Sequence, residues 1–250
     1  MSRSLFCAPA SPIPILMYHQ IALAPPKGAA FRSLYVSPEA FARQMWLLKR
    51  LGYQGLSMTA LQPYLSGEKR GKVCGITFDD GYVNNLQHAL PALKKYGFSS
   101  TCYAVSQRLG MSNDGDHAAG VLSAPLMDAH QLRDWAAAGQ EVGAHTRHHV
   151  HLPGLSAAES VQEIAVCKAE LEAASQSSVR NFCYPYGDFG SEHVAVVRNA
   201  GYLTATTTAR ARCQAGDDLL QLPRVPVVRS TTLPVFWLKL ATAYEDRRKV

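Results

Sequence analysis

The sequence has no apolar run long enough to cross a membrane, because charged residues such as Lys239 interrupt its longest apolar stretches. A spanning helix needs about 20 apolar residues, so we expect no transmembrane segment. A persuasive secretory leader is also missing, since the apolar segment after Arg3 is short and contains Pro9. These absences favour a cytoplasmic location, with the periplasm or cell envelope as the alternative.

The six cysteines show no CxxC pairing. Cys74, Cys102 and Cys183 fall in segments that we predict to be strands, where cysteine serves as a small apolar residue. This usage favours a reducing compartment over a disulfide framework or a zinc knuckle.

Charge is sparse as well, at 18% of residues, and the net charge of +6 comes from scattered lysines and arginines. No basic stripe interleaved with aromatic residues is present, which argues against a nucleic-acid partner. Peripheral contact with an anionic membrane face remains compatible with this charge. The sequence does not determine the oligomeric state.

What the sequence does contain is a repeated unit of amphipathic helix, glycine and extended run. Gly52, Gly97, Gly139 and Gly201 stand where a helix ends in a left-handed residue, and Ser37-Pro38 is a helix start. Strands that alternate with helices indicate a parallel sheet, either a β/α barrel or an open doubly wound sheet. The predicted strands are 13–18, 53–57, 72–78, 98–105, 140–144, 180–184, 202–207 and 219–227.

The length and composition predict one domain over residues 1–250, with an inserted loop at 106–125. Asp114, Asp116 and His117 lie in this loop. For these three we favour solvated loop chemistry over a second metal site.

Polar residues gather just after the predicted strands, where both candidate architectures place their sites. Asp79 and Asp80 follow one strand, and His145 and His149, four residues apart, follow another. One carboxylate with two imidazoles makes a three-ligand metal site that leaves positions open, which is typical of catalysis. The second carboxylate can then accept a proton from water. We expect His148 and His151 to face solvent or to bond to backbone.

The segments "TFDDGY", "HTRHH" and "RNFCYPYG", in this order, resemble the NodB-homology polysaccharide deacetylases, carbohydrate esterase family four. The resemblance runs from "PILMYHQI" to "LPRVPV" and implies an irregular (β/α)7 barrel. It also implies that Asp79 is the catalytic base and that Asp80, His145 and His149 are the metal ligands. The backbone N–H of Tyr186 would then stabilise the oxyanion.

Two departures from the family pattern affect the other roles. Cys183 stands where many members carry an arginine, and no histidine follows His193. The segment "LMYHQ" and the late "LPR" resemble the poly-N-acetylglucosamine deacetylase branch, which implies His19 as the acid and Arg224 as the partner of Asp79. Beside these motifs, we expect cleft-lining roles for a set of substrate-binding residues, namely Tyr82, Tyr186 and Asp188.

The resemblance implies a hydrolase that removes N-acetyl groups from an amino-sugar polysaccharide or glycoconjugate. From its His₂Asp ligands we expect zinc, with cobalt, nickel, manganese or iron as alternatives. Three other hypotheses remain at this point: a deformylase or deacylase of a lipid-linked amino sugar, a non-catalytic glycan-binding protein, and a non-haem iron oxygenase. The oxygenase leaves the second aspartate unexplained.

Overall fold

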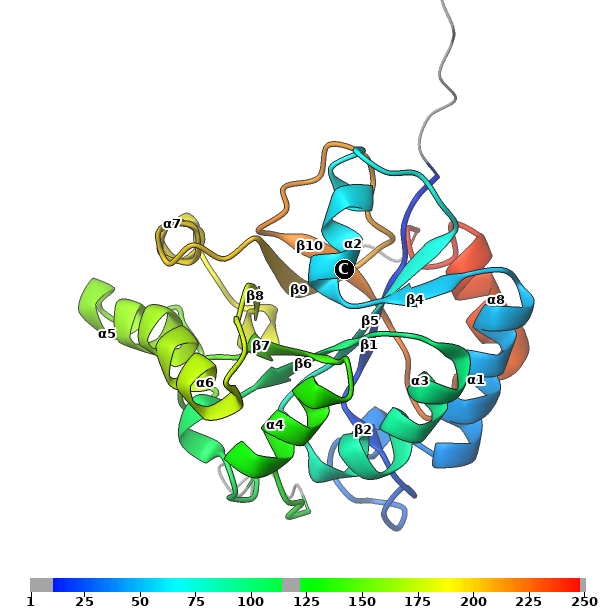
Figure 1. Cartoon of the computed structure of the whole chain (residues 1–250), viewed down its shortest axis with the longest axis horizontal. Coiled ribbons are helices and arrows are strands. Elements are labelled where there is room, and N and C mark those ends of the chain that lie inside the picture. The colour runs from blue at the N-terminus through cyan, green and yellow to red at the C-terminus, as the bar shows by residue number, and fades with distance from the viewer. Residues whose placement is uncertain (1–10, 114–121, 248–250) are drawn as a thin grey trace, which may run out of the picture.

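The computed structural model describes residues 11–113 and 122–247, and its centre is a parallel β-barrel (Figure 1). Its sheet has eight strands in the order β1-β10-β9-β8-β7-β6-β5-β4, and β1 also pairs with β5. Seven strands therefore close the ring, which confirms the (β/α)7 barrel. The strands are β1 (Ile15–Tyr18), β4 (Gln54–Leu56), β5 (Val73–Phe78), β6 (Thr101–Ala104), β7 (Glu141–Ala144), β8 (Asn181–Cys183), β9 (Thr204–Arg210) and β10 (Leu222–Pro226).

The extra strand β4 shares one edge of β5 with β6. Gly75 pairs with Ile15 of β1 and also with Leu56 of β4, so β1 and β4 lie on opposite edges of β5. Further along, Thr77 pairs with Thr101 of β6 on the β4 side. The sequence prediction of eight strands is therefore confirmed. It missed the short β2 (Gln20–Ile21) and β3 (Tyr35–Val36), which form a separate two-stranded sheet.

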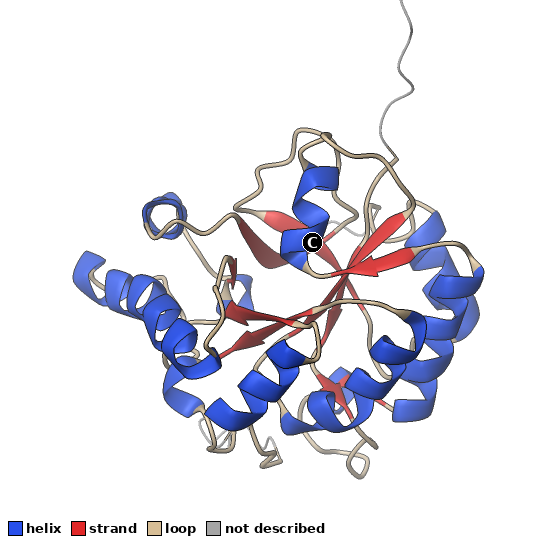
Figure 2. Ribbon diagram, in the orientation of Figure 1, coloured by secondary structure: helices blue, strands red, loops and turns tan. Residues whose placement is uncertain are grey.

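Helices surround the strands (Figure 2), as the repeated unit predicts. The side chain of Ser37 accepts a hydrogen bond from Ala40 N, and Gly97 ends its helix with φ 65°, so the predicted start and stop signals are confirmed. No helix of the described residues is both long and apolar enough to span a membrane. The helices are α1 (Pro38–Arg50), α2 (Met58–Leu65), α3 (Leu90–Tyr96), α4 (Ala129–Ala137), α5 (Ala157–Val161), α6 (Cys167–Ser175), α7 (Ser191–Asn199) and α8 (Leu233–Ala241).

The pleat of the strands decides which side chains enter the barrel. Alternate residues point to opposite faces, and the inward set forms its own buried cluster with Ile15, Val73, Tyr103, Cys183 and Leu222. Below that layer, Glu141 accepts hydrogen bonds from Thr101 and Asn181 and fills the N-terminal end. Every second residue along a strand points into the barrel. His19, Asp79 and His145, which follow β1, β5 and β7, therefore lie inside the barrel at its C-terminal end.

Candidate active site

The two adjacent aspartates point in different directions because the chain turns between them. Asp79 N donates to Tyr18 O at 2.9 Å, so Asp79 continues the ladder of β5 and faces inward. Asp80 then adopts φ 72° and Gly81 φ 83°. Left-handed backbone is costly for a residue with a side chain and persists where the surroundings impose it. Of the six such non-glycine residues in the described part of the chain, five lie at this site, namely Phe31, Asp80, Thr146, His149 and Tyr186.

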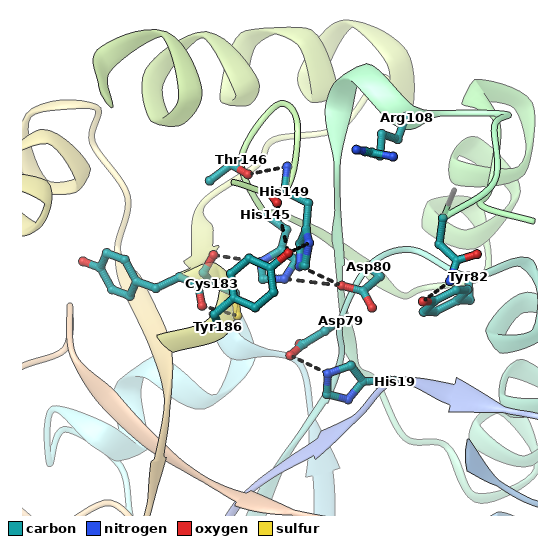
Figure 3. Close-up of polar contacts among 12 residues, drawn as sticks. His19, Asp79, Asp80, Tyr82, Arg108, His145, Thr146, His149, Cys183 and Tyr186 are labelled. Carbon is teal, nitrogen blue, oxygen red and sulfur yellow. Dashed lines mark hydrogen bonds and ion pairs between the residues drawn. The ribbon is translucent and has the colours of Figure 1, made fainter. Parts of the chain in front are cut away.

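Asp80, His145 and His149 converge at the mouth of the barrel (Figure 3). Asp80 Oδ1 lies 3.5 Å from His145 Nε2 and 3.4 Å from His149 Nε2. We refer to these three residues as the triad. The structure brings them together from two strand ends, as the spacing of the motifs predicted.

The two imidazoles of the triad turn Nε2 toward Asp80, and a hydrogen-bond contact at Nδ1 fixes the orientation of each ring. His145 Nδ1 lies 2.8 Å from Cys183 O, and because a carbonyl only accepts, Nδ1 donates a hydrogen there, while Nε2 faces Asp80. His149 Nδ1 lies 3.0 Å from the hydroxyl of Tyr186. Such outer contacts are what metal-binding histidines use to fix their ring orientation.

The protonation states of the triad suit a cation. Burial opposes ionisation of Asp80, but its hydrogen bond with His145 and the nearby imidazoles outweigh it and lower the Asp80 pKa. Burial lowers the pKa of His149 to about 4, so this imidazole is neutral at pH 7. Burial also opposes the charged form of His145, yet Cys183 and Asp80 raise its pKa, so a cation there displaces a proton. The donor set of the triad fits a divalent cation.

Arg224 holds Asp79 as an ionised carboxylate. Its two terminal nitrogens donate to Asp79 Oδ1 at 2.7 Å and Oδ2 at 2.8 Å, and both side chains are buried. Burial raises the Asp79 pKa, but Arg224 outweighs this effect and lowers it. The pair therefore stabilises the fold at neutral pH, and this contribution is lost as the pH falls through the lowered pKa. Arg224 also donates to Cys183 Sγ at 3.2 Å, beside the position where the family carries another arginine.

His19 lies on the other side of Asp79. Its Nε2 is 3.8 Å from Asp79 Oδ2, which is within ion-pair range and beyond a hydrogen bond. Asn85 Nδ2 donates to the carbonyl of His19 and helps to hold the backbone there. The predicted acid, the predicted base and the predicted ligands are thus neighbours.

Two pockets open on either side of the triad. The larger, of about 270 Å³, is lined by His19, Tyr35, Tyr184 and Asp79 among others. The smaller, of about 90 Å³, includes Arg108. Both contain Tyr82 and Tyr186, as predicted for cleft residues, and both contain Asp80 and His149.

Asp188, the third predicted cleft residue, lines neither of these pockets. Its carboxylate lies 2.7 Å from His151 Nδ1, and the His151 ring stacks on Tyr186 with centroids 3.8 Å apart. His148 and His151 are exposed to solvent, as expected, with 49% and 61% of their side-chain surface accessible, and His148 also bonds the carboxylate of Glu163. His148 and Glu163 are 15 positions apart in the chain, and His151 and Asp188 are 37 apart. Short sequence motifs therefore could not predict these two contacts. Asp114, Asp116 and His117 lie outside the described residues.

A parallel barrel of seven strands, with paired aspartates and two histidines at its C-terminal end, is the arrangement that the resemblance to the NodB-homology deacetylases implied. The Polysaccharide deacetylase family profile matches residues 66–205. The chain belongs to this family, whose members deacetylate polysaccharides. The matched range contains Asp79, the triad and Tyr186, whereas His19 and Arg224 lie outside it.

Individual relatives agree with this assignment. The polysaccharide deacetylase homologue YxkH of Bacillus subtilis is 29% identical over 217 residues, which cover 86% of this chain and 71% of YxkH. The structure of Streptococcus pyogenes deacetylase PplD in complex with acetate is 25% identical, with a TM-score of 0.80 over 93% of this chain and 99% of that one. IcaB from Ammonifex degensii shares the fold, with 24% identity and a TM-score of 0.77 over 93% and 97% of the two chains.

Proposed function

We propose that this protein is a divalent-cation-dependent hydrolase that removes N-acetyl groups from an amino-sugar glycan and releases acetate. The observation that carries the proposal is the triad of Asp80, His145 and His149 beside an ionised Asp79. When bound at the triad, a divalent cation, with zinc the first candidate, polarises the acetamide carbonyl and makes water acidic enough to react near neutral pH.

Asp79 is the proposed general base. Its two bonds to Arg224 leave further lone pairs on the carboxylate, which has about four acceptor positions. Because Arg224 keeps Asp79 ionised, the carboxylate is ready to take the proton from the attacking water. Arg224 acts on the base and not on the substrate.

His19 is the proposed general acid. An amine leaves poorly unless it is protonated, and His19, which lies next to Asp79 in the larger pocket, can deliver that proton. The backbone N–H of Tyr186 is the proposed donor to the carbonyl oxygen as negative charge develops there. The exposed ring of Tyr186, which lines the larger pocket, suits the face of a sugar.

Acetate release from a panel of N-acetylated oligosaccharides, polysaccharides and lipid-linked amino sugars tests this function. An N-formylated member of the panel distinguishes deformylation from deacetylation. We expect acetate and a free amine in equal amounts from at least one glycan. Tight glycan binding without release of any acid would instead support a non-catalytic binding protein.

The acid role of His19 has its own test. His19→Gln is expected to lower kcat about 10²–10⁴-fold, because the leaving amine then lacks its proton donor. A His19→Gln variant that keeps the wild-type kcat would show that His19 is not the acid.

Tyr186→Phe tests the support of His149. Loss of the hydroxyl that bonds His149 Nδ1 is expected to weaken zinc binding about 10–100-fold, as measured by competition with a chromophoric chelator. Tyr202→Phe is the matched control, since its hydroxyl bonds Ile164 O in the core and lies outside both pockets. Equal zinc affinity in the two variants would mean that Tyr186 does not orient this ligand.

We also propose a reducing compartment for the protein. The cysteines Cys74, Cys102, Cys167, Cys183 and Cys213 are free and buried. Burial raises the thiol pKa of Cys74 and Cys102, which leaves these two thiols unreactive. Fractionation of the source cells tests this proposal, and recovery of the protein outside the reducing compartment would refute it.

A further inference from the structure

The smaller pocket lies across the triad from the proposed acid. Figure 3 shows Arg108 on one side of the triad and His19 on the other. The volume of about 90 Å³ is well below the ~300–1,000 Å³ of a small-molecule site, so this pocket holds one substituent and not a whole sugar. Its lining consists of Asp80, Tyr82, Val105, Arg108, Asn113, Leu126, His149 and Tyr186.

Arg108 is held in place by the loop that carries the histidines. It ends the turn Ser106–Arg108, in which Ser106 N donates to Thr146 O and Gln107 N donates to Arg147 O. Ser106 Oγ donates to Glu170, and this glutamate also binds the guanidinium of Arg147. The backbone that carries Arg108 is therefore fixed relative to the triad, and a fixed group binds a ligand with less loss of entropy.

The guanidinium of Arg108 keeps donors available for a ligand. Its Nε lies 3.4 Å from His148 O, and none of the described residues forms an ion pair with it. By contrast, Arg147, Arg210, Arg212 and Arg224 each pair with a carboxylate. Among the described residues that line the pocket, Asp80 is the one acid, and it belongs to the triad. A planar guanidinium matches a carboxylate or a phosphate.

We propose that Arg108 binds an anionic substituent of the glycan, a carboxylate or a phosphate ester on or next to the acetylated sugar. Asn113 and Tyr82, which are hydrogen bonded to each other at 3.2 Å, provide polar groups at the same pocket. The enzyme then prefers an acidic glycan to a neutral one. This inference rests on the proposed function, because it places a substrate group beside the same triad.

Binding is measured with zinc-loaded Asp79→Asn protein, so that turnover does not consume the ligand. Three N-acetylated oligosaccharides of equal length are compared by calorimetry: one neutral, one with a carboxylate substituent and one with a phosphate ester. We expect at least one acidic ligand to bind about 10-fold or more tightly than the neutral one, and the better of the two identifies the anion. A second substitution, Arg108→Gln, should remove the preference, whereas Arg108→Lys should keep part of it.

Lys69→Gln is the control for loss of one positive charge. Lys69 is exposed and precedes β5, so it lies at the opposite end of the barrel from the triad. Equal binding of all three ligands, or a preference that survives Arg108→Gln, would overturn the role of Arg108.

The two proposals fail in different ways. Wild-type acetate release that is equal from neutral and acidic glycans refutes the anion site and leaves the deacetylase intact. An Arg108-dependent binding preference without acetate from any glycan refutes the deacetylase and leaves the anion site intact.

Discussion

Asp79→Asn is expected to lower kcat for acetate release about 10²–10⁴-fold while the protein keeps its cation. The amide cannot take a proton from water, but it preserves the size of the side chain and one oxygen that can accept from Arg224. Asp79 contributes no atom to the triad, so zinc content should stay at the wild-type level. Acetate release and metal content are measured on the same preparation.

Two controls make this result interpretable. Thermal unfolding shows whether the buried Arg224, now without a charged partner, has disturbed the fold. Asp134→Asn, an exposed position on α4, should retain full activity. A folded Asp79→Asn protein with near wild-type kcat would show that another group removes the proton.

Asp80→Ala is expected to lose zinc and activity together. The substitution removes the oxygen that lies within 3.5 Å of both histidine Nε2 atoms, and with it the anionic member of the triad. Two neutral imidazoles bind a divalent cation much more weakly than the complete set. Zinc content after dialysis should fall to background, and acetate release should fall with it.

The comparison of the neighbouring variants is the sharpest part of this test. Asp79→Asn separates metal content from turnover, whereas Asp80→Ala removes both. The reverse pattern, with metal lost from Asp79→Asn and kept by Asp80→Ala, would exchange the two roles. Full activity of metal-free Asp80→Ala protein would refute the metal-dependent mechanism.

Much of the barrel is predictable because each strand is a local pattern. Glycines such as Gly97 mark helix ends, and the apolar run before Asp79 is a buried strand in any parallel fold. The pleat then places Asp79 inside the barrel. Asp80 follows from the sharp turn at Gly81, so the different environments of adjacent carboxylates are readable from "TFDDGY".

The wall of the larger pocket was not predictable in the same way. Phe31, Leu34 and Tyr35 reach the site through the small sheet of β2 and β3, each only two residues long. Strands this short leave no periodic pattern in a sequence. Their position depends on tertiary packing, as does the backbone of Phe31 at φ 51°.

Contacts between distant side chains were also beyond local pattern. The resemblance implied that Arg224 pairs with Asp79, and the two residues are 145 positions apart in the chain. No motif indicated that the Tyr186 hydroxyl would bond His149. Nor did any motif indicate that Asp188 would bond His151 and not line a pocket. Such pairings depend on loop conformations that only the folded chain defines.

Titration of metal-free protein with zinc, with acetate release followed at each step, shows whether turnover requires a cation at the triad. We expect no turnover after exhaustive chelation, a linear rise in turnover with added zinc, and saturation at about one ion per chain, as a single three-ligand site requires. Undiminished acetate release from protein shown to be free of metal would contradict this expectation.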